Sequence, residues 1–102
     1  MELTFEPLQR EDLAACYALC MQSFSESVPL EEVEQTFALC SRDPSYRLVV
    51  GKLDGRVVTY ATLHFFHTVF DGMRPMATIW YVCVDPAYRS RGIGKALFAE
   101  LC

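Results

Sequence analysis

The segment of this chain best suited to binding a ligand contains two glycines among three basic residues. Residues 85–95 read Asp-Pro-Ala-Tyr-Arg-Ser-Arg-Gly-Ile-Gly-Lys. Gly92 and Gly94 allow the backbone to approach a ligand closely, and N–H groups that open a helix have no intrahelical acceptor. Three basic side chains surround them: Arg89, Arg91 and Lys95. The segment therefore predicts a site for a phosphate or diphosphate group.

Three phosphate-binding patterns compete for this segment. A Walker loop is excluded, because Lys95 is followed by Ala96 and residue 89 is not a glycine. A dinucleotide fingerprint fits poorly, since Leu97 occupies the place of its third glycine. The remaining pattern, [RQ]-x-x-G-x-[GA], is met by residues 89–94.

The net charge and the composition limit the classes of binding partner that the chain could have. The chain has 13 acidic and 9 basic residues and a formal net charge of −4, which disfavours nucleic-acid binding because that requires a broad basic surface. No stretch has the apolar length needed to cross a bilayer, so we expect no membrane partner. A small anionic ligand fits the locally basic segment better.

The five cysteines indicate a reducing compartment. Their number is odd and no C-x-x-C pair occurs, so we expect free thiols and a cytoplasmic location. Cys16 and Cys20 lie one helical turn apart, but the sequence offers no matching ligands, and a core position is the better interpretation. His64 and His67 are expected on opposite faces of a strand. No metal site is predicted.

The elements that must position the glycine segment follow from apolar periodicity. Period-two and helical patterns predict the order β-α-α-β-β-β-α in a single domain, residues 1–102. The expected strands cover residues 2–6, 46–53, 56–66 and 76–84, and the expected helices cover residues 13–24, 30–40 and 92–102. Asp54-Gly55 and Asp71-Gly72 predict hairpin turns. In residues 76–84 apolar residues occupy both alternating sets of positions, so both faces of this strand are apolar. We therefore expect it at the centre, covered on both faces.

Residues 79–101 closely resemble the signature of the GNAT superfamily of acyl-CoA-dependent N-acyltransferases. The resemblance rests on Val-Asp-Pro-Ala-Tyr-Arg at residues 84–89, followed by the glycine segment, and the element order is similar along the whole chain. It implies an α/β fold with a mixed sheet. It also implies an N-acetyltransferase that transfers an acetyl group from acetyl-CoA to a primary amine.

The resemblance implies a site residue by residue. N–H groups of residues 91–95, with the Arg89 and Arg91 side chains, would bind the CoA pyrophosphate. The backbone of residues 82–84 would pair with pantetheine at a strand edge opened by a bulge, and an N–H near Val82 or Cys83 would polarise the thioester. The full set of implied donor-binding residues is Val82, Cys83, Val84, Arg89, Ser90, Arg91, Gly92, Ile93, Gly94 and Lys95.

The chain departs from the family at the catalytic base. Trp80 stands where many members carry a glutamate, so the catalytic residues stay unassigned. Glu26, Tyr81 and His64 are the candidates for a base. Trp80 could line the acceptor pocket, although a large aromatic residue on a central strand more often belongs to the core. The loop over residues 25–27 resembles the family's acceptor-binding segment, and an ordinary polar connection explains it equally well.

A second departure is length. The family continues beyond the helix that starts near Gly92, so we expect a C-terminally incomplete domain whose strand over residues 76–84 has an exposed edge. Such an edge predicts marginal stability and favours a homodimer. The alternative functions are a catalytically silent acyl-CoA-binding or interaction module and an α/β interaction domain that binds no cofactor.

Overall fold

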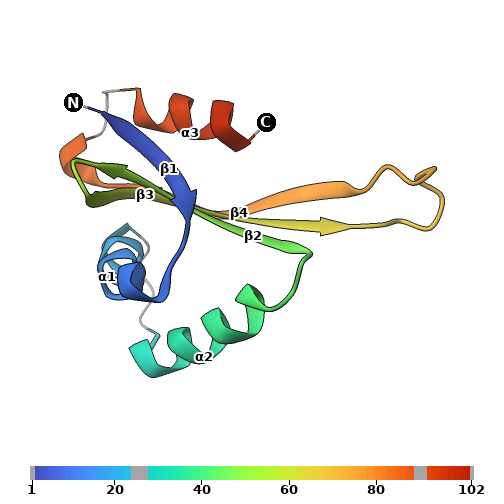
Figure 1. Ribbon diagram of the computed structural model, residues 1–102, viewed down its shortest axis with the longest axis horizontal. Helices are drawn as coiled ribbons and strands as arrows, with labels where there is room; N and C mark the ends of the chain where they lie inside the picture. Colours follow the sequence, from blue (N-terminus) through green and yellow to red (C-terminus); the bar gives the residue numbers. More distant parts are fainter. Residues whose placement is uncertain (1, 24–27, 89–91, 102) are drawn as a thin grey trace.

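The computed structural model describes residues 2–23, 28–88 and 92–101, in which a four-stranded sheet lies between two layers of helices (Figure 1). The predicted order of strands and helices is confirmed, with two short 3₁₀ helices added. The elements are β1 (Leu3–Pro7), η1 (Arg10–Asp12), α1 (Leu13–Ser23), α2 (Leu30–Ser41), β2 (Tyr46–Leu53), β3 (Arg56–Phe66), β4 (Met76–Val84), η2 (Pro86–Tyr88) and α3 (Ile93–Leu101).

The sheet has the order β1-β2-β3-β4, and every neighbouring pair is antiparallel. Within the described part of the chain, β4 is therefore an edge strand that pairs with β3 alone. The expectation that this strand lies at the centre is wrong, and coverage on both faces holds only for its C-terminal half, where Cys83 packs with α1 and Val82 and Val84 pack on the α3 face. Met76, Ile79 and Trp80 remain 52%, 39% and 66% exposed, because the β3–β4 hairpin extends well beyond the helical layers (Figure 1).

The two faces of the sheet carry separate cores. On one face α1 packs through Leu13, Cys16 and Cys20 against a cluster that includes Val50 and Tyr60. Helix α2 adds the partly buried Val33 and Phe37 to the same cluster. On the other face α3 lies across the sheet (Figure 1). Its side chains pack against residues of β2, β3 and β4 in two hydrophobic clusters. The buried members of the two clusters are Val49, Leu53, Val58, Ala61, Leu63, Ile93 and Leu97. The helix that follows the glycine segment is thus anchored to the sheet.

A partly buried ionic cluster joins β1, η1 and β2. The Lys52 ammonium lies 2.8 Å from a Glu6 carboxylate oxygen and 2.9 Å from one of Asp12. Hydrogen bonds to Glu6 and then to Asp12 raise the pKa of Lys52. The cluster holds the first turn before α1 against the sheet, and therefore fixes where α1 begins.

The histidines have separate partners. His67 Nδ1 lies 2.8 Å from an Asp71 carboxylate oxygen in the β3–β4 hairpin loop, whereas the His64 ring lies 4.6 Å from the Tyr46 ring. The described residues contain no group of three side chains suited to holding a metal ion. None of the described helices is long and apolar enough to span a membrane.

Candidate functional site

The glycine segment opens α3 and is sterically accessible. Gly92 is exposed with φ +76°, and a Cβ atom added to Gly92 or Gly94 would meet no atom of the described residues within 4 Å. The first bond of the helix runs from the Ala96 N–H to the Gly92 carbonyl at 3.0 Å. The amides of residues 93–95 therefore lie in the turn that has no intrahelical acceptors. Arg89, Ser90 and Arg91 lie outside the described residues, so their predicted roles stay predictions.

The turn before the glycine segment is held by Asp85. Its carboxylate accepts the Ala87 N–H at 2.9 Å, and its carbonyl accepts the Tyr88 N–H at 2.9 Å. The Asp85 N–H donates in turn to the Val58 carbonyl at 2.7 Å. These three bonds explain the Asp-Pro pair in the sequence, because they bring the chain from the end of β4 to the start of α3.

A β-bulge interrupts the pairing of β4 with β3. Tyr60 pairs with Cys83 and Thr62 with Trp80, so Ala61 alone faces two residues, Tyr81 and Val82. Tyr81 has φ +59°, a left-handed conformation uncommon for a bulky residue. The bulge implied by the family resemblance is therefore present, and it stores backbone strain at this position.

The bulge determines which backbone groups reach the open edge. The Thr59 hydroxyl donates to the Cys83 carbonyl at 2.6 Å, so that carbonyl points toward β3. Because successive residues of a strand point their N–H and C=O groups to opposite edges, those of Val82 and Val84 face away from β3. Of the three residues expected to pair with pantetheine, Val82 and Val84 have the suitable direction.

Comparison with known proteins decides the family. Residues 13–102 match the Acetyltransferase (GNAT) family. The chain belongs to this GNAT family. It is 30% identical over 105 residues to a glucosamine 6-phosphate N-acetyltransferase of Trypanosoma brucei brucei, an alignment that covers the whole chain and 71% of the relative.

Solved structures agree with this GNAT assignment. An acetyltransferase from Trypanosoma brucei is 28% identical and superposes with a TM-score of 0.81 over 99% of this chain and 72% of that one. Glucosamine-6-phosphate N-acetyltransferase from Arabidopsis thaliana shares the fold at 19% identity, with a TM-score of 0.82 over the same shares of the two chains. The predicted GNAT fold and family are thus confirmed.

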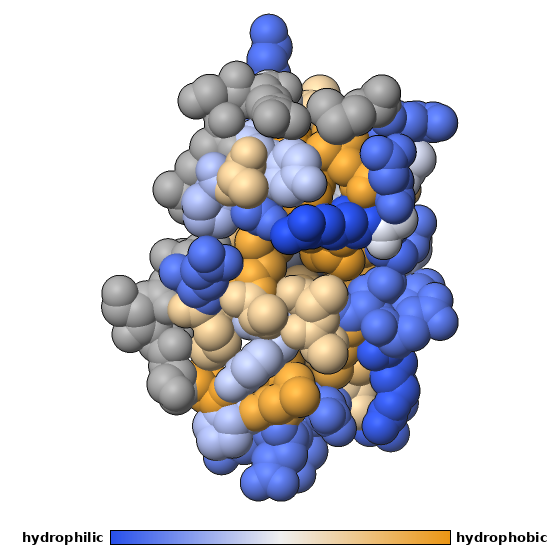
Figure 2. Space-filling model, turned by 90° about the vertical axis from the view of Figure 1, so that its left-hand side faces the viewer, coloured by the Kyte–Doolittle hydropathy of each residue, from blue (hydrophilic) through white to orange (hydrophobic). Residues whose placement is uncertain are grey.

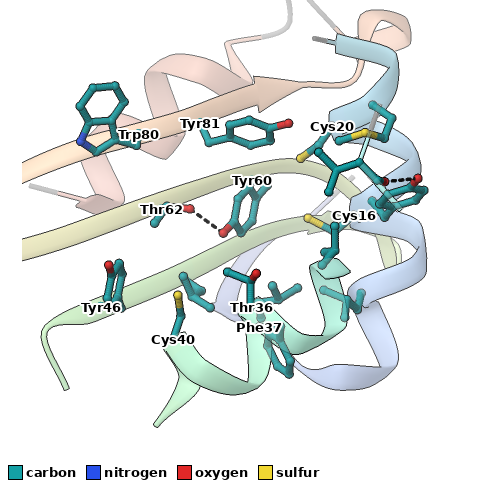
Figure 3. A pocket seen from close by; sticks show the side chains of 17 residues that line it. Cys16, Cys20, Thr36, Phe37, Cys40, Tyr46, Tyr60, Thr62, Trp80 and Tyr81 are labelled. Atoms are coloured by element: carbon teal, nitrogen blue, oxygen red, sulfur yellow. Dashed lines mark hydrogen bonds between the residues drawn. The ribbon is translucent and has the colours of Figure 1, made fainter. Parts of the chain in front are cut away.

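A pocket of about 470 Å³ lies beside the β4 bulge, between the sheet and helices α1 and α2 (Figure 3). Sequence reasoning missed it, because its walls come from elements far apart in the chain. Its lining residues are Leu8, Leu13, Cys16, Tyr17, Cys20, Met21, Val28, Val33, Thr36, Phe37, Cys40, Tyr46, Leu48, Tyr60, Thr62, Trp80 and Tyr81. Trp80 lines this pocket and is 66% exposed, so its core interpretation is wrong.

The three base candidates are placed differently. Tyr81 lines the pocket directly at the bulge. His64 packs against Tyr46 and does not line the pocket, and Glu26 lies outside the described residues. Tyr81 is therefore the one candidate that the described structure brings to the pocket.

Cys20, which lines the pocket, and Cys83, which lies against it from β4, are held as neutral thiols. Cys20 Sγ lies 3.3 Å from Cys83 Sγ, and both residues are buried free cysteines, as expected. Hydrogen bonding with Cys16 and burial raise the pKa of Cys20 to about 12. Hydrogen bonding with Cys20 and burial raise the pKa of Cys83 as well.

These shifts predict that stability falls as pH rises above 9. The unfolded thiols ionise near their ordinary value of 9.0 while the folded ones stay protonated, so the native state binds more protons and alkali favours unfolding. By pH 10 each thiol should cost about 1.4 kcal/mol of the free energy of unfolding relative to pH 8. Urea titrations at both pH values measure this. A Cys20→Ala/Cys83→Ala variant should show a flatter profile, and an equally steep one would contradict the assignment.

Proposed function

We propose that this chain binds acetyl-CoA and transfers its acetyl group to a primary amine. The observation that supports this most strongly is the accessible glycine turn at the start of α3, which directly follows a bulged edge strand. Together they offer amide donors for a diphosphate and an unpaired strand edge for an extended chain. The named activity of the trypanosomal relative, N-acetylation of an amino sugar phosphate, supports the same reaction class.

In this proposal different backbone groups bind the diphosphate, the pantetheine arm and the thioester of acetyl-CoA. Amides of residues 93–95 bind the diphosphate, and Lys95, which is exposed in the first turn of α3, adds positive charge. Val84 pairs with the pantetheine arm at the open edge. The Val82 N–H, next to the strained Tyr81, donates to the thioester oxygen as negative charge develops on it. Transfer is direct: the neutral amine attacks the polarised carbonyl, the C–S bond to CoA breaks, the amine nitrogen loses a proton, and the departing thiolate takes one up to leave as free CoA.

The second candidate function is a catalytically silent acyl-CoA-binding module. The specific observation that favours it is that no carboxylate or imidazole lines the described part of the pocket. A proton leaving the amine would then need the Tyr81 hydroxyl or a chain of water molecules.

Two measurements test the proposal. Calorimetry with acetyl-CoA at low salt should give a dissociation constant in the micromolar range, and release of free CoA in the presence of an amine panel should follow. Binding without amine-dependent CoA release would support the silent module instead. No binding of acetyl-CoA would leave only an interaction domain.

A further inference from the structure

The pocket beside the bulge is electrically neutral along its described lining. None of its seventeen lining residues is Asp, Glu, Lys, Arg or His. Trp80 and Tyr81 connect it to the bulge, where the proposed transfer takes place. We propose that the acceptor is a primary amine on an uncharged, apolar body, which this pocket receives. The amine in this inference follows from the proposed function. The apolar body that carries the amine follows from the lining of the pocket.

Burial and hydrogen bonding favour the neutral form of two ionisable side chains in the pocket, Tyr60 and Cys20. Burial raises the pKa of Tyr60, whose hydroxyl lies 2.6 Å from that of Thr62. Hydrogen bonding with Cys16 and burial keep the Cys20 thiol protonated. The Tyr17 hydroxyl donates to the Val28 carbonyl at 2.6 Å. These groups already have hydrogen-bond partners within the protein, so they offer a ligand few further hydrogen bonds and no charge.

Charged acceptors would lose hydration here without compensation. Moving an ionised group out of water is costly unless an opposite charge pairs with it, and the described lining supplies none. The acceptor named for the trypanosomal relative carries a phosphate, and polyamines carry several positive charges. Both classes are therefore disfavoured relative to an amine with a single apolar substituent.

Shape and position agree with this substrate class. The volume of about 470 Å³ lies within the range of small-molecule sites, roughly 300–1,000 Å³. Side chains from β4, β3 and α2 approach the same space, Tyr81, Tyr60 and Cys40 among them (Figure 3). The face of the molecule in Figure 2 also exposes apolar surface, with polar residues along one side of it. An apolar body in this pocket would leave its amine near the bulge.

A binding experiment tests the pocket without requiring turnover. Trp80 is the one tryptophan of the chain and lines the pocket, so its fluorescence reports occupancy. The probes are two acetylated products, N-acetyl-2-phenylethylamine and N-acetylglucosamine 6-phosphate, in which the amine charge is absent. We expect the first to bind at least about tenfold more tightly. Equal binding, or tighter binding of the sugar phosphate, would overturn the inference.

A matched pair of variants locates the effect. Thr36→Arg places a cation at an exposed position that lines the pocket, whereas Gln35→Arg adds the same charge at the neighbouring exposed position outside the lining. Thr36→Arg should reduce the preference for the apolar product at least about threefold, and Gln35→Arg should leave it unchanged. Equal effects of the two variants would contradict binding in this pocket.

Turnover separates this inference from the proposed function. With acetyl-CoA, 2-phenylethylamine should be acetylated faster than glucosamine 6-phosphate. If the apolar product binds as expected and no amine is acetylated, the pocket inference stands and the enzymatic proposal fails. If glucosamine 6-phosphate is the faster acceptor, the enzymatic proposal stands and the apolar acceptor is refuted.

Discussion

Replacing Gly92 with aspartate is expected to weaken acetyl-CoA binding at least about 100-fold, which corresponds to roughly 3 kcal/mol. The change places a carboxylate beside the amides that open α3, where it competes with the diphosphate and repels it. Because a Cβ atom at Gly92 meets no atom within 4 Å in the part of the chain that the structure describes, that part leaves space for the side chain. Calorimetric titration of the variant with acetyl-CoA measures the loss.

Two control variants isolate the charge. Gly72 has φ +63° and lies in the β3–β4 hairpin loop, at the far end of the hairpin from α3 (Figure 1). Gly72→Asp therefore introduces the same residue at a similar backbone conformation, and should bind acetyl-CoA like the parent. Gly92→Ala adds strain at φ +76° without charge, so an intermediate loss is expected. If Gly92→Asp binds as tightly as Gly72→Asp, the glycine turn is not the diphosphate site.

Local patterns in the sequence account for most of the fold. The alternation before Pro7, the Asp54-Gly55 turn and the helical stripe of Ile93 and Leu97 each correspond to an observed element. Such patterns depend on neighbours within a few residues, so they can be read from one chain. The position of β4 in the sheet could not be predicted in this way. Apolar residues on both faces of a strand show that the strand is apolar, but they do not identify the strands that pair with it.

The candidate site was predictable only in part for the same reason. The glycine segment is contiguous, so its residue pattern can be recognised in the sequence, and Gly92 is exposed at the start of α3. The conformation of Tyr81 is set by pairing with β3, and nothing about a tyrosine in a strand indicates φ +59°. The pocket combines Cys20, Phe37 and Trp80 from α1, α2 and β4. Its neutrality becomes visible only when the fold brings those residues together.

Removing the Val82 N–H is expected to lower kcat about 100-fold while acetyl-CoA affinity changes little. Replacing Val82 by its α-hydroxy acid exchanges that N–H for an ester oxygen and keeps the side chain. The loss of one backbone donor to a developing oxyanion typically costs about 10²–10³ in kcat. The direction of this N–H away from β3 follows from the Cys83 carbonyl, which accepts from Thr59. Steady-state kinetics with saturating acetyl-CoA measure the change.

The same exchange at Val84 is the matched control. Its N–H also faces the open edge, but Val84 pairs with Thr59 beyond the bulge, where the proposal gives it a part in binding the pantetheine arm. The Val84 ester should therefore raise the dissociation constant of acetyl-CoA severalfold and leave kcat nearly unchanged. Opposite effects at two residues only two positions apart would distinguish an oxyanion donor from a binding contact, since general loosening of β4 would change both constants in both variants. A Val82 ester with the kcat of the parent would exclude this amide as the donor and remove the functional explanation for the strained Tyr81.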